Sequence, residues 1–307
     1  MADSPARQRA LAQMLCGAAL IGTNGLMVRL ADTAPTVSAF YRMLLGGVLL
    51  ALVLRLRGAW RPLPARLWAW AALPATAFAA DLWLWHRSIH LVGPGLATVL
   101  ANAQVFFMAL AGVAFYRERV GARFVAGLLL AFGGLWLMLG GDWVRLPAQY
   151  RWGVWLGLAT GLCYAAYNLA LKRAQQAAYR ASAGHAPVGQ LLAMMSLLCA
   201  ALLGLAALGE GASLRIPDLA TLGWLLALAA LGHCLSWVLI SRALPYLSVA
   251  LVGLLLLLQP VVAFLLDVLA LARATSAREW LGLAVTLAGI FVAGLPSRRV
   301  RGATPPA

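Results

Sequence analysis

Two apolar stretches, residues 97–112 (ATVLANAQVFFMALAG) and residues 254–267 (LLLLLQPVVAFLLD), decide how this chain folds. Each stretch holds a glutamine, Gln104 in the first and Gln259 in the second. Hydrocarbon offers a buried amide no hydrogen-bonding partner, so an amide in such a run needs a partner or a function inside the protein. The two glutamines therefore indicate places where the apolar runs face something other than lipid.

The whole chain is far more apolar than a soluble protein. Of its 307 residues, 63% are hydrophobic and 11% charged, whereas about a quarter are charged in an average soluble domain. Apolar segments of roughly 20 residues, long enough to cross about 30 Å of hydrocarbon, recur along its length. The longest connection between them, 172–187, is too short for a core of its own. We predict an all-α integral membrane protein with ten transmembrane helices, at residues 11–30, 36–56, 67–88, 94–116, 124–140, 152–171, 188–208, 220–241, 247–270 and 278–295.

The formal charge of +15 follows membrane topology rather than a nucleic-acid-binding face. With the N-terminus inside, 16 of the 24 lysines and arginines fall in inner segments, seven in outer segments, and one, Arg42, within a span. This distribution predicts that both termini are cytoplasmic. The N-terminal segment lacks a convincing small-residue cleavage site, so we expect an uncleaved first span. The four cysteines lie singly in apolar spans, without the spacing of a disulfide framework or a metal site.

The two halves of the sequence resemble each other at an offset of 155 residues. This register places Gln104 on Gln259, and it also aligns glycines and arginines of the flanking spans. We therefore predict two five-helix repeats, at residues 11–140 and 152–295. Because five is an odd number, the second repeat enters the membrane from the opposite side, and inverted repeats are a route to alternating access. The further aligned pairs are Arg87 with Arg242, Arg123 with Arg278, Gly127 with Gly282, and Gly134 with Gly289.

Polar side chains within the spans are the candidate site residues. Gln104 and Gln259 lie about 10 and 12 residues from their span ends, which at about 1.5 Å per residue is near the midplane. Such amides either hydrogen-bond a neighbouring helix or line a cavity for a small polar solute, which needs a few directional hydrogen bonds on an apolar wall. The predicted substrate-binding set is Asn24, Arg42, Asn102, Gln104, Tyr164, Tyr167 and Gln259.

Arg42 and Asp81 are the two most costly residues of the spans, because an ionised side chain at membrane depth needs a partner or water. Both lie roughly 10 Å below the outer surface at about 1.5 Å per residue. We expect a salt bridge or a shared water-filled vestibule between them, and either a structural or a functional role. In a functional role, Arg42 would hold an anionic group of the substrate and Asp81 would couple transport to protons. Four nearby residues are interpreted as interfacial anchors: Trp83, Trp85, His86 and His90.

No pattern of catalytic, nucleotide-binding or metal-ligating residues appears in the sequence. We therefore predict a protein that is not an enzyme, has no cofactor, and transports passively or by coupling to a proton or solute gradient. The expected partners are a small-molecule substrate and the lipid bilayer, with nucleic acid excluded and a homodimer left open.

The order and spacing of four strings resemble the EamA-like family of the drug/metabolite transporter superfamily. The strings are IGTNGLMVR (21–29), FYRMLLGG (40–47), YRERVGARFVAGLLLAFGGLWLMLG (116–140) and LLQPVVAFLL (257–266). The resemblance covers residues 11–295 and implies an inner-membrane exporter or exchanger of small metabolites such as amino acids, with a cavity between the two halves. Alternatives that remain open are a lipid or lipid-linked sugar translocase and a non-transporting membrane scaffold.

Two positions depart from the pattern of that family. The usual proline of the fourth span is replaced by Val105, whereas Pro260 is present in the ninth, so the resemblance implies a fourth span without a kink. The turn glutamate is present as Glu118, but its repeat position is Arg273. Symmetric acidic turns are therefore not expected.

Overall fold

The computed structural model describes residues 5–61, 65–116, 121–139, 143–181, 188–243, 246–247 and 255–294. Throughout this part of the chain the secondary structure is helical and no strand occurs, which confirms the all-α fold. Six helices are long and apolar enough to cross a membrane, and three shorter apolar helices accompany them. The elements are α1 (Pro5–Gly22), α2 (Asn24–Leu30), α3 (Pro35–Leu56), α4 (Arg66–Val92), α5 (Pro94–Ala101), α6 (Gln104–Tyr116), α7 (Ala122–Leu139), η1 (Trp143–Arg145), α8 (Ala148–Ala181), α9 (Val188–Gly209), α10 (Leu219–Ala227), η2 (Leu228–Leu235), α11 (Ser236–Ala243), α13 (Leu258–Ala270) and α14 (Ala277–Gly294).

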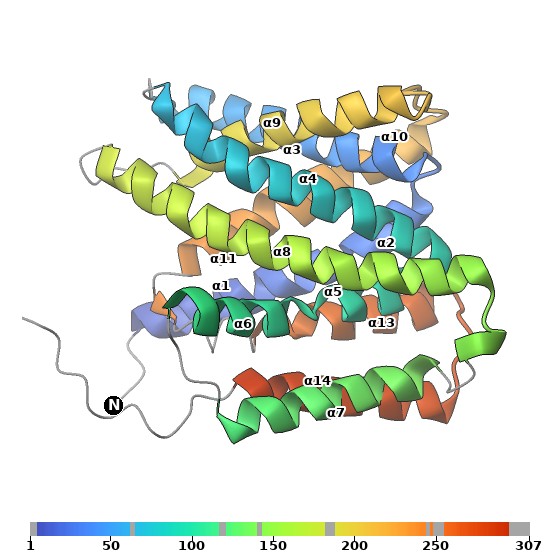
Figure 1. Cartoon of the computed structure of the whole chain (residues 1–307). Helices are drawn as coiled ribbons and strands as arrows, with labels where there is room; N and C mark the ends of the chain where they lie inside the picture. The colour runs from blue at the N-terminus through green and yellow to red at the C-terminus, as the bar shows by residue number, and fades with distance from the viewer. Residues whose placement is uncertain are drawn as a thin grey trace, which may run out of the picture.

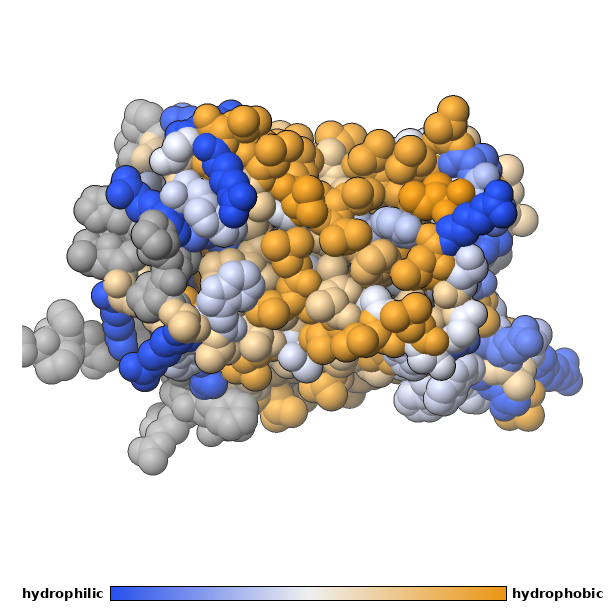
Figure 2. Space-filling model, turned by 90° about the horizontal axis from the view of Figure 1, so that it is seen from above, coloured by the Kyte–Doolittle hydropathy of each residue, from blue (hydrophilic) through white to orange (hydrophobic). Residues whose placement is uncertain are grey.

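The helices run in roughly one common direction, and α7 and α14 form a layer of their own along one side of the bundle (Figure 1). The space-filling view shows apolar side chains in a band across the middle and hydrophilic side chains at the two ends (Figure 2). A hydrophobic band between two polar ends is the surface that a bilayer requires. The bundle is therefore a multi-pass membrane protein.

Proline and aspartate mark several helix starts. Pro35 and Pro94 are the first residues of α3 and α5, a position at which the missing backbone N–H costs no hydrogen bond. Asp218 caps α10 by accepting a hydrogen bond from the backbone N–H of Thr221 at 2.7 Å. These signals explain why the helices begin where they do at one end of the bundle.

One predicted connection is largely helical. Helix α8 has 34 residues and ends at Ala181, so residues 172–181 of the predicted connection are helical and extend beyond the predicted span 152–171. The added segment is rich in Ala, Gln, Lys and Arg, which have high helix propensity, and it is too polar to have been counted as a span. The turn glutamate Glu118 lies outside the described residues.

Several spans are interrupted rather than continuous. The first breaks at Thr23, between α1 and α2, and the fourth breaks at residues 102–103, between α5 and α6. The eighth contains a π-helical segment, η2, between α10 and α11. The expectation that Val105 would leave the fourth span without a kink was therefore wrong. The break occurs at Asn102 and needs no proline.

Candidate functional site

A small cavity lies among the interrupted helices. Its volume is about 40 Å³, enough for about three water molecules at about 10–15 Å³ each. Its walls come from helices α1, α2, α3, α4, α5, α8, α11 and α13. Six of the eight predicted site residues line this central cavity: Asn24, Arg42, Asp81, Asn102, Tyr164 and Gln259.

The break in the fourth span places Asn102 at the cavity. Its side-chain Nδ2 donates to the carbonyl oxygen of Thr98 at 2.8 Å, and the backbone N–H of Ala103 donates to Leu100 at 3.0 Å in a tight i−3 turn. A side chain that competes for helix carbonyls in this way weakens the regular i−4 ladder. Gly161 of α8 packs directly against this break, so that a Cβ there would lie 3.0 Å from the backbone nitrogen of Gln104.

Helix α13 starts near the position in the second half that corresponds to the break at Asn102 in the first half. Leu257 is its N-cap and Pro260 lies in its first turn, where proline is tolerated because the first N–H groups have no intrahelical partner. The start of α13 places Gln259 at the cavity. Leu257 and Asn102 are related by the offset of 155 residues. Both glutamine-bearing runs are thus irregular immediately before their glutamine.

Arg42 and Asp81 share the cavity but do not form an ion pair. Their exposed fractions are 3% and 5%, and among the described residues the ion pairs involve other arginines. The guanidinium carbon of Arg42 lies 5.9 Å and 5.7 Å from the ring centroids of Phe78 and Trp85, within range of cation–π attraction. The expected salt bridge is therefore absent, and the two side chains line one cavity instead.

Several polar atoms of the lining residues have no hydrogen-bonding partner among the described residues. Such atoms are uncommon in buried positions, where a missing partner costs free energy. They include both acceptors and donors. The acceptors are Asn24 Oδ1, Asp81 Oδ1 and Asn102 Oδ1, and the donors are Arg42 Nε, Trp85 Nε1, Trp237 Nε1 and Gln259 Nε2.

Tyr167 and Gln104, the other two predicted site residues, lie outside the cavity lining. Tyr167 is fully buried and stacks on Phe78 with ring centroids 4.3 Å apart, so it supports the cavity wall from behind. Gln104 accepts a hydrogen bond from Asn168 Nδ2 at 2.9 Å. Its role in the described structure is therefore helix packing between α6 and α8.

Sequence reasoning missed the aromatic wall of the cavity, formed by Phe78, Trp85 and Trp237. Trp85 was interpreted as an interfacial anchor, but it is 7% exposed and lines the cavity. An aromatic residue near a span end gives the same sequence signal in both settings. The cost of Asp81 four residues earlier was the signal that could have assigned Trp85 to the interior, because residues one turn apart share a helix face.

The π-helical segment η2 positions another lining residue, Asn24. The carbonyl oxygen of Gly232 accepts hydrogen bonds from Asn24 Nδ2 at 3.1 Å and from Ser236 Oγ at 2.7 Å. On the same segment, His233 Nε2 lies 2.8 Å from Ser196 Oγ of α9. A π-helical turn changes the facing of its side chains and carbonyls, which is why such turns are frequent at functional sites.

Comparison with known proteins assigns the family. The EamA-like transporter family matches residues 8–140 and again residues 151–295. The chain belongs to the EamA-like transporter family. This EamA-like protein is 26% identical over 304 residues to the Bacillus subtilis (strain 168) protein named "Uncharacterized transporter YwfM", covering 94% of this chain and 95% of that one. An "Uncharacterized transporter" of Haemophilus influenzae is 28% identical over 137 residues, covering 43% of this chain and 45% of its own.

A solved structure shares the fold of this EamA-like transporter. The structure, titled "Crystal structure of protein", superposes with a TM-score of 0.69 and covers 96% of this chain and 100% of its own. Its sequence identity is 20%, so the likeness concerns the fold. Together with the apolar helices, the family places the chain among membrane transport proteins.

Proposed function

We propose that this protein is a secondary transporter that moves a small, amino-acid-like solute across the inner membrane by alternating access. The observation that carries the proposal is the buried pair of opposite charges, Arg42 and Asp81, which line one cavity without pairing with each other. Buried charges are costly when unpaired. A zwitterionic solute offers a carboxylate to the guanidinium and an ammonium group to the carboxylate, so its binding compensates both costs.

Asp81 is the residue to which we assign coupling. When ionised, its carboxylate attracts a cationic group of the solute; when protonated, it loses that attraction. Competition between a proton and the solute for one carboxylate links their movements in opposite directions, which suits an exporter or exchanger. Arg42 keeps its charge at all ordinary pH values and serves as the fixed anion site.

The paired contacts between α7 and α14 support the inverted arrangement of two repeats. A Cβ on Gly134 would lie 2.6 Å from the carbonyl oxygen of Gly282, and a Cβ on Gly289 would lie 2.6 Å from that of Gly127. The offset of 155 residues exchanges Gly127 with Gly282 and Gly134 with Gly289, so it converts the first contact into the second. A two-fold axis between antiparallel helices produces this relationship, and an axis in the membrane plane inverts one repeat relative to the other.

The duplicated family match and the distribution of basic residues support the remaining parts of the proposal. Two matches to one family within one chain are what a duplication produces. We assign five spans to each repeat, ten in all, and place both termini in the cytoplasm because inner segments hold 16 lysines and arginines against seven outside. We assign no enzymatic step to this transporter.

The cavity is too small for an amino acid in the described conformation. Its volume of about 40 Å³ is far below the roughly 300 Å³ at which ligand pockets of proteins begin. An amino acid therefore enters only when the helices around the cavity separate. Alternating access requires such a separation of helices.

Flux into proteoliposomes tests the proposal. Purified protein is reconstituted, and uptake of a panel of radiolabelled amino acids is measured with and without a pH gradient. We expect flux of at least one amino acid, and a loss of at least about tenfold in Arg42→Gln and Asp81→Asn, about 1.4 kcal/mol of lost binding. The proton gradient should stop accelerating any residual flux in Asp81→Asn, because the coupling group is gone.

Matched control variants distinguish the loss of a charge in the cavity from the loss of a charge elsewhere in the protein. Arg215→Gln and Asp218→Asn remove an exposed arginine and an exposed aspartate at one end of the bundle, and both should keep normal flux. Loss of flux in these controls to the same extent as in the cavity variants would contradict the assigned site. Absence of flux for every amino acid in the panel would contradict the proposal that the substrate is amino-acid-like.

A lipid translocase is the second candidate, favoured by a larger apolar groove between α1, α13 and α14. This groove of about 420 Å³ is lined by aliphatic and aromatic side chains, including Leu15, Leu258 and Phe291. None of the described residues that line it is charged, whereas a lipid headgroup needs basic residues at the rim. The same proteoliposomes, loaded with a fluorescent lipid and assayed for its movement between leaflets, distinguish the two candidates.

A further inference from the structure

Glu210 joins the two halves at the end of the bundle where α9 ends. Its carboxylate accepts hydrogen bonds from Thr36 Oγ1 at 2.7 Å and Trp83 Nε1 at 2.7 Å. It also accepts one from Arg87 Nη2 at 2.5 Å. The Arg87 guanidinium lies 3.8 Å from the ring centroid of Trp83, so the donors hold one another in place. All three donors come from α3 and α4 of the first half, whereas Glu210 belongs to the second.

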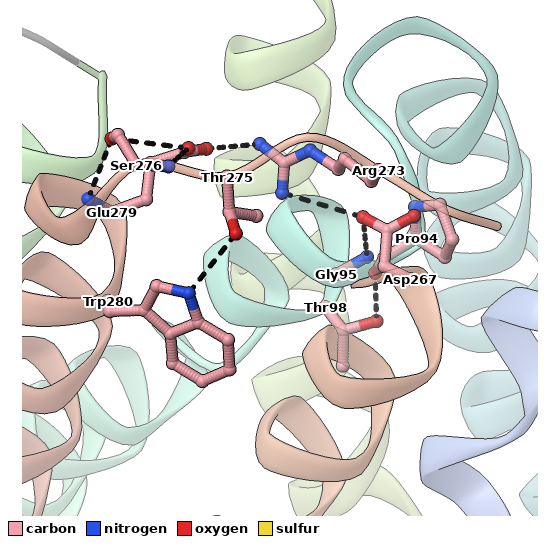
Figure 3. A network of polar contacts seen from close by, with 9 residues as sticks. All are labelled: Pro94, Gly95, Thr98, Asp267, Arg273, Thr275, Ser276, Glu279 and Trp280. Carbon is pink, nitrogen blue, oxygen red and sulfur yellow. Dashed lines mark hydrogen bonds and ion pairs between the residues drawn. The ribbon is translucent and has the colours of Figure 1, made fainter. Parts of the chain in front are cut away.

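Asp267 makes a second connection between the halves at the same end. Its Oδ2 accepts a hydrogen bond from the backbone N–H of Gly95, the second residue of α5, at 3.3 Å. Figure 3 shows the guanidinium of Arg273 between the carboxylates of Asp267 and Glu279, at 3.5 Å and 2.5 Å. Asp267 is 2% exposed, and a Cβ on Gly95 would lie 3.0 Å from its Oδ2. Glycine is thus what allows α5 to approach this carboxylate.

The two carboxylates play equivalent parts in the architecture. Each lies at or near the end of a second-half helix, α9 or α13, and each binds donors of the first half. At the opposite end of the bundle the described contact of this kind is uncharged: Gln190 of α9 pairs with the backbone of Arg61, at 2.6 Å and 3.1 Å. The described connections between the halves are therefore charged at the end with Glu210 and Asp267 and uncharged at the end with Gln190.

We infer that Glu210 and Asp267 form a gate that closes this end of the central cavity, and that both carboxylates must release their first-half donors for it to open. The inference rests on the proposed alternating access. Under the proposed topology this is the outer end, since it is where α4 and α9 end and α5 begins. Glu210 is the more solvated of the two and Asp267 is buried, and a buried charge loses more than an exposed one when its partner leaves. Release of Glu210 therefore precedes release of Asp267.

Thiol labelling in the full-length protein tests the gate. The four native cysteines are replaced by alanine, and Ala101→Cys supplies one thiol in the cavity lining. We measure its reaction with a membrane-impermeant maleimide added to one face of oriented vesicles. A separate Arg215→Cys protein, with an exposed thiol at the same end, identifies which face carries the gate. We expect E210Q/D267N to increase labelling from that face by at least about fivefold, with smaller increases for each single change.

The control is Asp218→Asn, which neutralises another carboxylate at this end that bonds only within the second half. Labelling of the E210Q/D267N protein at the control rate would overturn the gate. So would an equal increase from both faces, because that reports general loosening rather than opening of one end. Amino-acid flux is measured in parallel. Increased labelling together with no transported amino acid would support the gate and reject the proposed function. Amino-acid flux without a change in labelling would support the proposed function and reject the gate.

Discussion

The carboxamide of Asn24 lies directly against the Cα of Gly232, with its Nδ2 donating to the carbonyl oxygen of Gly232 at 3.1 Å. A Cβ at position 232 would overlap Asn24 Oδ1. Asn24 follows the break between α1 and α2, and Gly232 lies in the π-helical segment η2. This contact therefore joins two irregular segments, one from each half, at the edge of the central cavity.

Gly232→Ala should destabilise the protein by about 1–3 kcal/mol through overpacking, and transport should fall with it. Asn24→Ala removes the overlapping atoms, so the double variant should be more stable than Gly232→Ala alone, with a coupling energy of about 0.5–3 kcal/mol. Thermal unfolding in detergent measures both. Gly223→Ala is the control, because a Cβ there meets nothing within 4 Å. Additive effects of the two changes would show that the contact is not as described.

Adjacent glycines of α7 provide a second matched pair. A Cβ on Gly134 would collide with the backbone of Thr286 and lie 2.6 Å from the carbonyl of Gly282, whereas a Cβ on Gly133 meets nothing within 4 Å. Backbone atoms cannot rotate away, so Gly134→Ala should cost about 1–3 kcal/mol of stability. Gly133→Ala should raise stability by about 0.5–1 kcal/mol, since alanine is the better helix former. Equal melting temperatures for the two variants would refute the packing of α7 on α14.

The two repeat-related glutamines should respond differently to truncation. Gln259 lines the cavity with an unpartnered Nε2, so Gln259→Ala should lower solute flux by about tenfold, the loss of one good hydrogen bond of about 1.4 kcal/mol. Gln104 bonds Asn168 instead, so Gln104→Ala should cost about 1 kcal/mol of stability with flux within about threefold of normal. Flux at saturating and at low solute concentration distinguishes these outcomes. An equal loss in both variants would place Gln104 in the site.

The pH response of the gate follows from the pKa of Glu210. Burial raises this pKa, but hydrogen bonds from Thr36 and Trp83 and the charge of Arg87 outweigh it, so the pKa lies below its ordinary value of 4.5. A lowered pKa means that the Glu210 clamp is fully formed above the ordinary value and is lost only as the pH falls through the lowered one. In an Asp267→Asn background, we measure labelling of Ala101→Cys relative to that of the exposed Arg215→Cys thiol at the same pH, because the thiolate that reacts becomes scarcer as the pH falls. This ratio should stay constant from about pH 8 to about pH 5 and rise only at more acidic pH. An increase near neutral pH would contradict this assignment.

Much of the framework could be predicted from the sequence because hydropathy is a local property. Runs of about 20 apolar residues reveal spans without knowledge of their neighbours, and most predicted boundaries lie within a few residues of the helices observed. Arg42 and Asp81 were recognisable for the same reason, since the free-energy cost of a charge in hydrocarbon depends little on which helix carries the charge. Where the local signal weakened, as in the polar residues 172–181, hydropathy did not reveal that helix α8 continues.

The sequence by itself determined that the chain is helical, that it lies in a membrane, and which polar residues need a partner there. Only the tertiary structure decided which partner each residue has. Gln104 and Gln259 occupy the same register, yet one bonds Asn168 and the other faces the cavity, because the rotation of a helix about its axis is set by packing against neighbours. Likewise Trp85 lines the cavity rather than serving as an interfacial anchor, and Arg42 and Asp81 line the same cavity without forming an ion pair. Distances between helices arise from contacts among residues far apart in the chain, and no local pattern encodes them.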